Sequence, residues 1–190
     1  MKSVFLSKFK SLFLFLSAFV PMHFLILVKL LVDILNHNKT FNVLNIINIL
    51  TLSMFIFLGF FGVYFNIFHN NHSNDIITIK YFKNLTDQHF LGYFSLFVLF
   101  ALQLDLTYVS GYCTYVLIFI FIGIVYIKNS LFYINPLLNI MGFSFYDIIF
   151  ISKGEKQNLR AFSKHSLEIN KKYKVKFKSK NFAFIIDKIN

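Results

Sequence analysis

The 190-residue sequence has few of the residues that disulfides, metal cages and catalytic sites need. It holds one cysteine, Cys113, one arginine, Arg160, two prolines, no tryptophan, and eight Asp and Glu residues against 19 Lys and Arg. One cysteine permits no intrachain disulfide and no cysteine-based metal cage. The sequence also lacks a P-loop, a Gly-x-Ser-x-Gly, a His-Glu-x-x-His and paired carboxylates within an apolar segment. We therefore expect neither an enzyme nor a bound metal or cofactor.

Apolar residues are what the chain has in abundance. They make up 57% of it, only 14% is charged, and the mean hydropathy is +0.64. Soluble domains average about 45–50% apolar and about 25% charged. A bilayer core of about 30 Å takes roughly 20 apolar residues as a helix. By that measure the sequence predicts four spans, at about 9–35, 43–68, 89–106 and 108–127.

The lysines orient these predicted spans. Lys2, Lys8 and Lys10 precede the first span, Lys80 and Lys83 follow the second, and the part from Lys128 onward carries twelve Lys and Arg against four acids. The loop after the third span has none. Because lysine and arginine concentrate on the cytoplasmic side, both termini are expected in the cytoplasm.

Three charged residues fall within or beside the spans. Asp105 lies near the end of the third span, where a carboxylate either reaches interfacial water or lines an ion or proton path. Lys29 and Asp33 are four residues apart in the first span, so they can pair on one helix face or extend towards the interface. Pro21 is expected to kink the first span, because it removes one helical hydrogen bond.

A second region follows the spans. Pro136 disfavours helix at Asn135, Gly142 is a plausible helix stop, and the "FSFYDIIFIS" that follows is typical of a strand. "NLRAFS", "HSLEI", "KYKVKFK" and "FAFIIDKI" read as further strands, with a turn at "KGEK". The predicted fold is thus an all-α integral membrane protein with four transmembrane helices over 1–134. A small antiparallel β-rich cytoplasmic module would occupy 135–190.

Alternating lysines mark one predicted strand. Lys172, Lys174, Lys176 and Lys178 share one face of "KYKVKFK", opposite Tyr173, Val175 and Phe177. The lysine face is open to three interpretations: it is simply solvated, it lies on anionic lipid headgroups, or it contacts an acidic partner. Direct nucleic-acid binding is not expected, because no aromatic side chains interleave with these lysines.

The layout resembles that of a known family. The lysine-bearing N-terminus, "LSAFVPMHFLILVKLL" in the first span, "INPLLNIMGFSFYDI" at the membrane exit and the short β-rich tail are similar to KwaA, the membrane subunit of the bacterial Kiwa anti-phage defence system. The resemblance implies a homo-oligomeric inner-membrane sensor that works with a cytoplasmic DNA-binding effector, KwaB. It assigns no functional residue here.

The sequence therefore predicts a membrane scaffold or sensor in phage defence that recruits a cytoplasmic effector. Two alternatives remain open. One is a pore or transporter subunit with Asp105 on a polar path, and the other is a membrane protein of superinfection exclusion.

Overall fold

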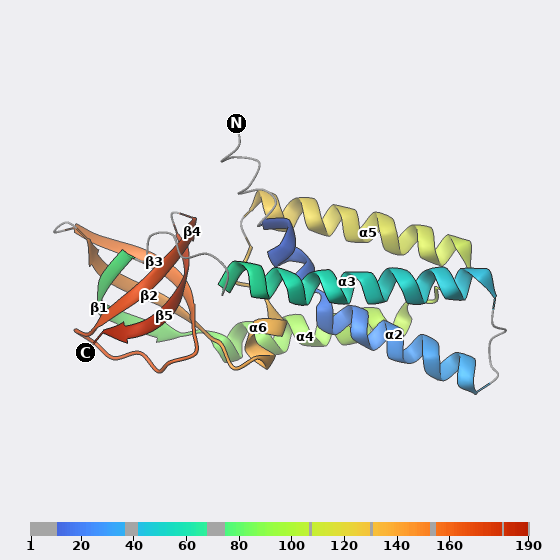
Figure 1. Ribbon diagram of the computed structural model, residues 1–190, viewed down its shortest axis with the longest axis horizontal. Coiled ribbons are helices and arrows are strands. Elements are labelled where there is room, and N and C mark those ends of the chain that lie inside the picture. The colour runs from blue at the N-terminus through green and yellow to red at the C-terminus, as the bar shows by residue number, and fades with distance from the viewer. Residues whose placement is uncertain are drawn as a thin grey trace.

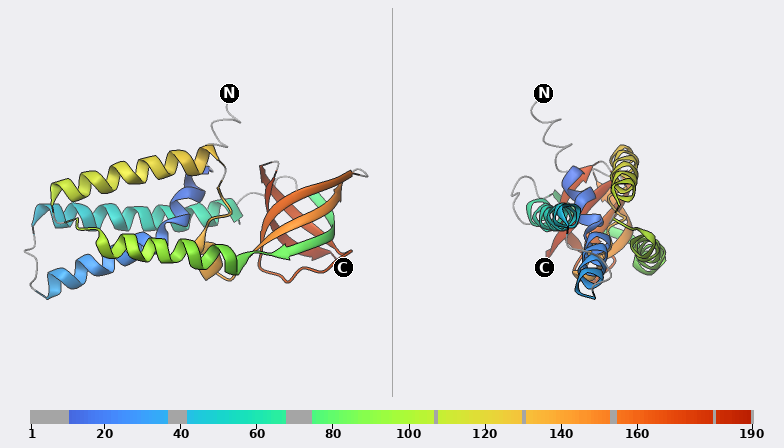
Figure 2. Two further views of the ribbon diagram at one scale, coloured as in Figure 1. Left: turned by 180° about the vertical axis from the view of Figure 1, so that it is seen from behind. Right: turned by 90° about the vertical axis from the view of Figure 1, so that its right-hand side faces the viewer.

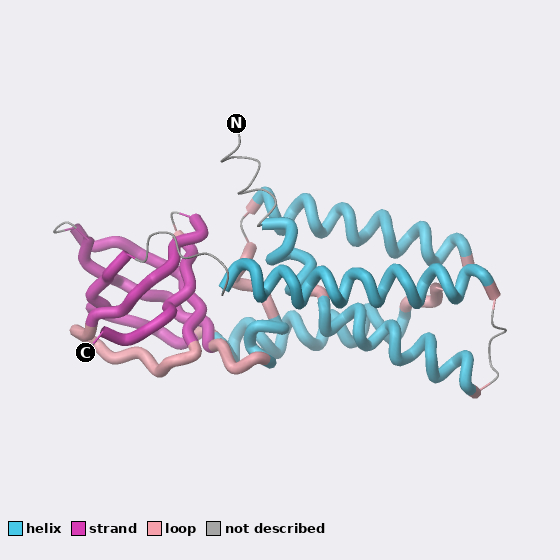
Figure 3. Tube along the Cα trace, viewed as in Figure 1, coloured by secondary structure: helices cyan, strands magenta, loops and turns pink. Residues whose placement is uncertain are grey.

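A bundle of helices and a β-barrel form the two ends of an elongated molecule (Figures 1 and 3). The computed structural model describes residues 11–36, 42–67, 75–106, 108–129, 131–152, 155–179 and 181–189. A first helix, Ser11–Ala18, precedes the labelled helices. These are α2 (Val20–Leu35), α3 (Val43–Ile67), α4 (Thr86–Gln103), α5 (Val109–Lys128) and α6 (Pro136–Ile140). The strands are β1 (Asp75–Asn84), β2 (Ser144–Ser152), β3 (Glu155–Ser163), β4 (Lys172–Ser179) and β5 (Phe182–Ile189).

The first apolar segment is bent. Ser11–Ala18 and α2 meet at an angle of 45°, with Phe19 between them. Pro21 explains the bend, because its nitrogen carries no hydrogen to donate to the Ser17 carbonyl four residues earlier. The predicted kink is confirmed. Figure 2 shows α3, α4 and α5 arranged around this bent segment.

Two glycines let α3 approach the first helix closely. A Cβ atom on Gly62 would lie 2.6 Å from the Phe13 carbonyl oxygen, and one on Gly59 would lie 3.0 Å from the Leu16 carbonyl oxygen. Real Cβ atoms do not come within 3.0 Å of backbone atoms. Small residues are therefore required at this crossing, although they do not form a GxxxG motif.

The predicted fold class, four transmembrane helices with a small β module, is wrong. Among the described residues, α3 and α5 are long and apolar enough to cross a membrane, and the bent pair of Ser11–Ala18 and α2 would make a third span if it counts as one. The expected span at 89–106 fails, because the apolar part of α4 is only Gly92–Gln103. At 1.5 Å per residue that part is about 18 Å long, well short of a bilayer core.

The β region is a closed five-stranded barrel, not an antiparallel module confined to the tail. Its strands are joined in the order β1-β2-β3-β5-β4, and pairing of β1 with β4 closes it. All pairs are antiparallel except β3 and β5. β1 comes from between α3 and α4, where the sequence predicted only a loop with two lysines. Ile77 and Ile79 alternate into the barrel interior and are buried.

The remaining strand predictions have mixed outcomes. "FSFYDIIFIS", "KYKVKFK" and "FAFIIDKI" are confirmed as β2, β4 and β5, and "NLRAFS" falls within β3. "HSLEI" is not a strand, since residues 164–171 are irregular and Asn170 has a φ of 62°. This segment packs Leu167 into the barrel core instead. The turn predicted at "KGEK" includes residues 153 and 154, which lie outside the described residues.

Candidate functional site at the junction of the helices and the barrel

A row of aromatic rings runs from the bent helix into the barrel. Phe15 lies 5.4 Å from Tyr126 of α5, Tyr126 lies 5.9 Å from Phe132, and Phe132 lies 5.9 Å from Phe182 of β5, all measured between ring centroids. On the same strand, Phe182 continues to Phe184 at 5.4 Å. These rings belong to one buried cluster, which is separate from the cluster inside the barrel. The bundle core therefore extends onto the side of the barrel strands that faces the helices, and displacing the first helix would disturb those side chains directly.

Asn135 is the polar centre of this junction. It is 1% exposed, and its Oδ1 accepts a hydrogen bond from the Leu138 backbone N–H at 3.2 Å, which caps α6. Its Nδ2 donates to Ser17 Oγ at 2.7 Å. Ser17 in turn donates to the Leu14 carbonyl. Pro136 suits the first position of α6, where a missing N–H costs nothing. The Asn-Pro pair therefore starts α6 and fastens it to the first helix just before its bend.

Two further links join helices to strands. Leu85, just before α4, is hydrogen-bonded to β2, since its N–H donates to the Phe145 carbonyl at 2.9 Å. The Phe145 N–H donates to Thr86 Oγ1 at 2.8 Å. On the other side, Lys176 of β4 is 4% exposed and its Nζ donates to the Ile67 carbonyl at the end of α3. The ends of α3 and α4 nearest the barrel are thus both tied to strands.

The outer surface of the junction carries a cation over an aromatic ring. The guanidinium of Arg160, on β3, lies 4.7 Å from the centroid of the Tyr133 ring. Tyr133 also stacks on Phe145 with 5.5 Å between centroids. Cation–π contacts of this kind contribute about 0.5–1 kcal/mol at exposed sites. The single arginine of the chain therefore joins a barrel strand to the connection that leads out of α5.

The opposite end of the bundle is held by polar side chains from two helices. Lys29 Nζ of α2 donates to the carbonyls of Leu102 and Leu104 at 2.6 and 3.0 Å, and Asn48 Nδ2 of α3 donates to that of Leu106 at 2.7 Å. These carbonyls lie at the end of α4, where helical partners run out. Lys29 therefore acts as a helix cap, a role that sequence spacing did not indicate.

Asp105 and Asp33 both lie near this opposite end. Asp105 is exposed in the turn that follows α4. A Cβ atom on Gly111 would lie only 1.9 Å from the Asp105 carbonyl oxygen. Asp33 is half-buried one turn after Lys29. Lys29 bonds to the Leu104 carbonyl, next to Asp105, so the three residues lie at the same end of the bundle. Their predicted roles in a polar path or an ion pair stay predictions.

The four lysines of β4 do not share one exposed face. Lys172 is exposed, Lys174 and Lys178 are half-buried, and Lys176 is buried. The predicted alternation holds, since Tyr173, Val175 and Phe177 all pack on the barrel core. The lysines differ in exposure because the end of α3 lies over part of the outward side of β4, where Lys176 donates to the Ile67 carbonyl.

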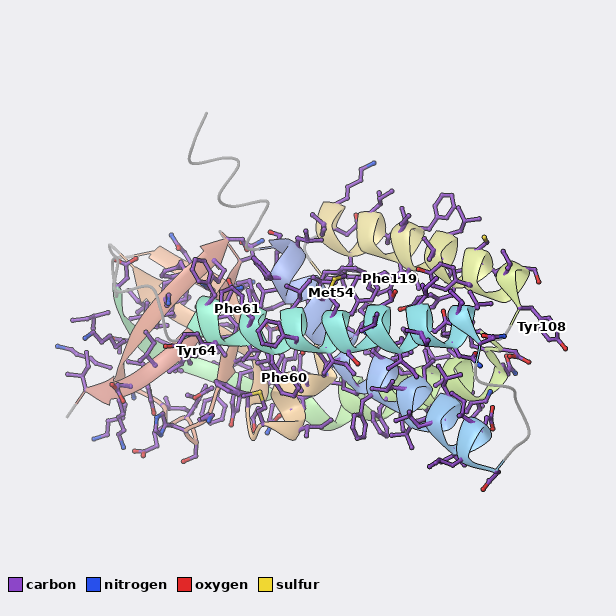
Figure 4. All side chains as sticks on the ribbon, turned by 45° about the vertical axis from the view of Figure 1, so that its right-hand side comes forward. Met54, Phe60, Phe61, Tyr64, Tyr108 and Phe119 are labelled. Carbon is purple, nitrogen blue, oxygen red and sulfur yellow. The ribbon has the colours of Figure 1, made fainter. Side chains whose placement is uncertain are left out.

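A histidine that the sequence argument passed over lies in the bundle interior. His23 is fully buried, and its ring centroid lies 5.1 Å from Phe119 and 5.2 Å from Phe55. Phe119 lies between α5 and α3 (Figure 4). His23 therefore takes the place of an aromatic ring in the core. Across the described ranges, no group of three His, Cys, Asp or Glu side chains could hold a metal ion. His37, His69 and His72 lie outside those ranges.

The barrel surface is basic, and an ion pair joins the irregular segment to β5. Lys188 of β5 donates to Glu168 Oε1. This hydrogen bond and the positive charge of Lys188 lower the pKa of the Glu168 carboxyl. Because both side chains are exposed, the pair adds little to stability.

The chain was compared with known proteins. The family model described as "Anti-phage protein KwaA" matches residues 10–185. The chain belongs to the KwaA family. The match covers the bent helix, the junction and nearly all of the barrel, so the predicted resemblance is confirmed and the chain is an anti-phage defence protein. Neither the curated proteins nor the solved structures gave a match.

Proposed function

We propose that this KwaA protein is the membrane-embedded scaffold or sensor subunit of a defence complex, and that its barrel recruits a cytoplasmic effector. The observation that carries the proposal is the junction. A shared aromatic core, the Asn135–Ser17 hydrogen bond and the Lys176–Ile67 hydrogen bond join the barrel to membrane-type helices. A disturbance of the helices is thereby transmitted to a soluble surface. The KwaB-like partner implied by the sequence resemblance fits the effector role.

Membrane placement is supported by the outward faces of α3 and α5. Met54, Phe57, Phe60, Phe61 and Tyr64 of α3 are 44–70% exposed, and Figure 4 shows four of them along that helix. Such a continuous apolar face requires a lipid or protein cover. A homo-oligomer in the bacterial inner membrane, with the basic barrel in the cytoplasm beside anionic lipids, satisfies this requirement.

The test compares phage protection with partner recruitment. Lys172, Lys174 and Lys178 are replaced with Gln in cells that carry the defence genes, while the buried Lys176 is kept. If the basic strand docks the partner, the partner should no longer co-purify and protection should fall, while the amount of membrane-inserted protein stays the same. Replacing Lys80, Lys83 and Lys128 removes the same charge elsewhere and serves as the matched control. Full recruitment by the β4 variant would contradict docking through this strand.

A further inference from the structure

One barrel strand extends past its neighbour. β3 begins at Glu155, but it pairs with β5 only over Arg160–Ser163, opposite Phe182–Ile185. Its other side pairs with β2 along the whole strand. The first half of β3, residues 155–159, therefore has a β2 neighbour on one side and no β5 neighbour on the other. A hollow of about 770 Å³ opens here, bounded by this half of β3, Asp147 of β2 and Asn181 before β5.

The backbone directions along this half-strand follow from one hydrogen bond. The Arg160 N–H donates to the Asn181 carbonyl at 2.9 Å, so it points to the β5 side. Both backbone groups of a residue in an antiparallel ladder point to the same side, and the side alternates along the strand. The β2–β3 register shows no shift. The N–H and C=O of Asn158 and Lys156 therefore also point to the β5 side, where no described residue bonds to them. Unpaired groups in a row are a template for another strand.

The side chains at this edge indicate what kind of strand fits. Lys156, Asn158 and Arg160 alternate onto one face and are all exposed. A second copy paired antiparallel about Lys156 would bring the two Lys156 side chains opposite each other, and like charges directly opposite are destabilising. An incoming segment with an acidic side chain opposite Lys156 would meet it with opposite charge. Phe182 of β5 already lies opposite Arg160, so Lys156 carries most of this preference, and Arg160 adds its positive charge from the same face.

We propose that the free edge of β3 binds an extended acidic segment of a partner protein by adding it to the barrel as a strand. This assignment rests on the proposed recruitment of an effector, and it names the chemistry by which the barrel would recognise it. The backbone of Asn158 and Lys156 supplies the hydrogen bonds. Lys156 selects acidic side chains over basic ones, and the nearby charge of Arg160 adds to this preference.

The binding experiment uses the full chain in detergent and a labelled ten-residue peptide that alternates glutamate and valine. A lysine–valine peptide tests charge. A glutamate–valine peptide methylated on alternate backbone nitrogens keeps the charge but cannot pair as a strand. By fluorescence anisotropy, the unmodified acidic peptide should bind at least about tenfold more tightly than either, since a lost hydrogen bond to a charged or buried group costs about 1–3 kcal/mol.

Variants of the edge complete the test. Asn158→Pro removes an N–H that points away from β2, so β2 pairing is kept and proline is tolerated at such an edge. It should abolish peptide binding, while Asn158→Ala keeps it. Lys156→Glu leaves the backbone unchanged and should reverse the preference towards the lysine–valine peptide. Equal binding of the methylated peptide, or tight binding by a correctly folded Asn158→Pro protein, would overturn the strand model.

The same variants separate this inference from the proposed function. In cells, a folded Asn158→Pro protein that still recruits the effector and protects against phage overturns edge binding alone. Effector recruitment that is unchanged by every barrel variant, including those in β4, contradicts the proposed function itself. Cross-linking of Lys156 to Lys156 of a second copy would show self-pairing and would also overturn the inference.

Discussion

At the scale of single residues, Asn135 shows how one side chain connects two parts of the molecule. Replacing it with alanine removes the cap of α6 and leaves Ser17 without its amide donor. Because the site is buried, Asn135→Ala should lower the free energy of unfolding by about 1–3 kcal/mol. Thermal unfolding of the purified protein in detergent measures this loss. Asn129→Ala, at an exposed helix end, is the control, and equal stability of the two variants would contradict the assigned role.

Asn135 also shows which structural features could be predicted from the sequence and which could not. Gly142, with a φ of 83°, follows the end of α6 as predicted, because a helix stop acts through local backbone geometry. The Asn-Pro pair was predicted only to interrupt helix, and in the structure it starts α6. Ser17 was not predicted as its partner, since 118 positions separate the two residues. Likewise, the burial of Lys176 depends on the end of α3 lying over it, and nothing in an alternating lysine pattern reveals that contact. Lys29 as a cap for α4 requires knowing which helices are neighbours.

At the scale of elements, the connection between α4 and α5 depends on a close backbone approach. Gly111→Ala would place a Cβ atom 1.9 Å from the Asp105 carbonyl oxygen, so the turn must shift. Overpacking of this kind should cost about 1–3 kcal/mol. Gly92, within α4, has no atom within 4 Å of the same position. Gly92→Ala should therefore leave stability unchanged or raise it by up to about 1 kcal/mol, through helix propensity.

Chemical or thermal unfolding of these two glycine variants under identical conditions checks the contrast. Opposite signs are expected, with Gly111→Ala destabilised. If both variants gain stability, the approach of Asp105 to Gly111 is not a feature of the folded protein.

Element prediction failed mainly where long-range pairing decides the structure. β1 has the apolar alternation of a strand at Ile77 and Ile79, but its flanking lysines also fitted a cytoplasmic loop. The apolar part of α4 continues into "LQLDL", which suggested a full span although the helix ends at Gln103. The β strands of the tail were found because β-branched and aromatic residues are dense there. The parallel β3–β5 pair and the closure of the barrel leave no local pattern in sequence.

At the scale of the whole molecule, orientation across the membrane follows from lysine placement. Single cysteines are introduced into a Cys113→Ser background by Ser166→Cys or Ser110→Cys. Ser166 lies beside the barrel, and Ser110 lies at the start of α5, at the opposite end near Tyr108 (Figure 4). If the barrel is cytoplasmic, a membrane-impermeant maleimide added to spheroplasts should label position 110 and leave position 166 unlabelled until the cells are lysed. Labelling of position 166 in sealed spheroplasts would reverse the proposed orientation.

The position of β1 ahead of three helices in the chain also sets an order of events during synthesis. Asp75 of β1 pairs with Val175 of β4, 100 positions later, and α4, α5 and α6 are made in between. At ribosomal rates of roughly 5–20 residues per second, β1 waits about 5–20 s for the strands that flank it. Lys80 and Lys83 discourage aggregation of the waiting strand, as charges do in exposed edges. Since the barrel cannot close before α4 and α5 have been made, its partner-binding surface is completed only on chains whose helical hairpin has already left the ribosome.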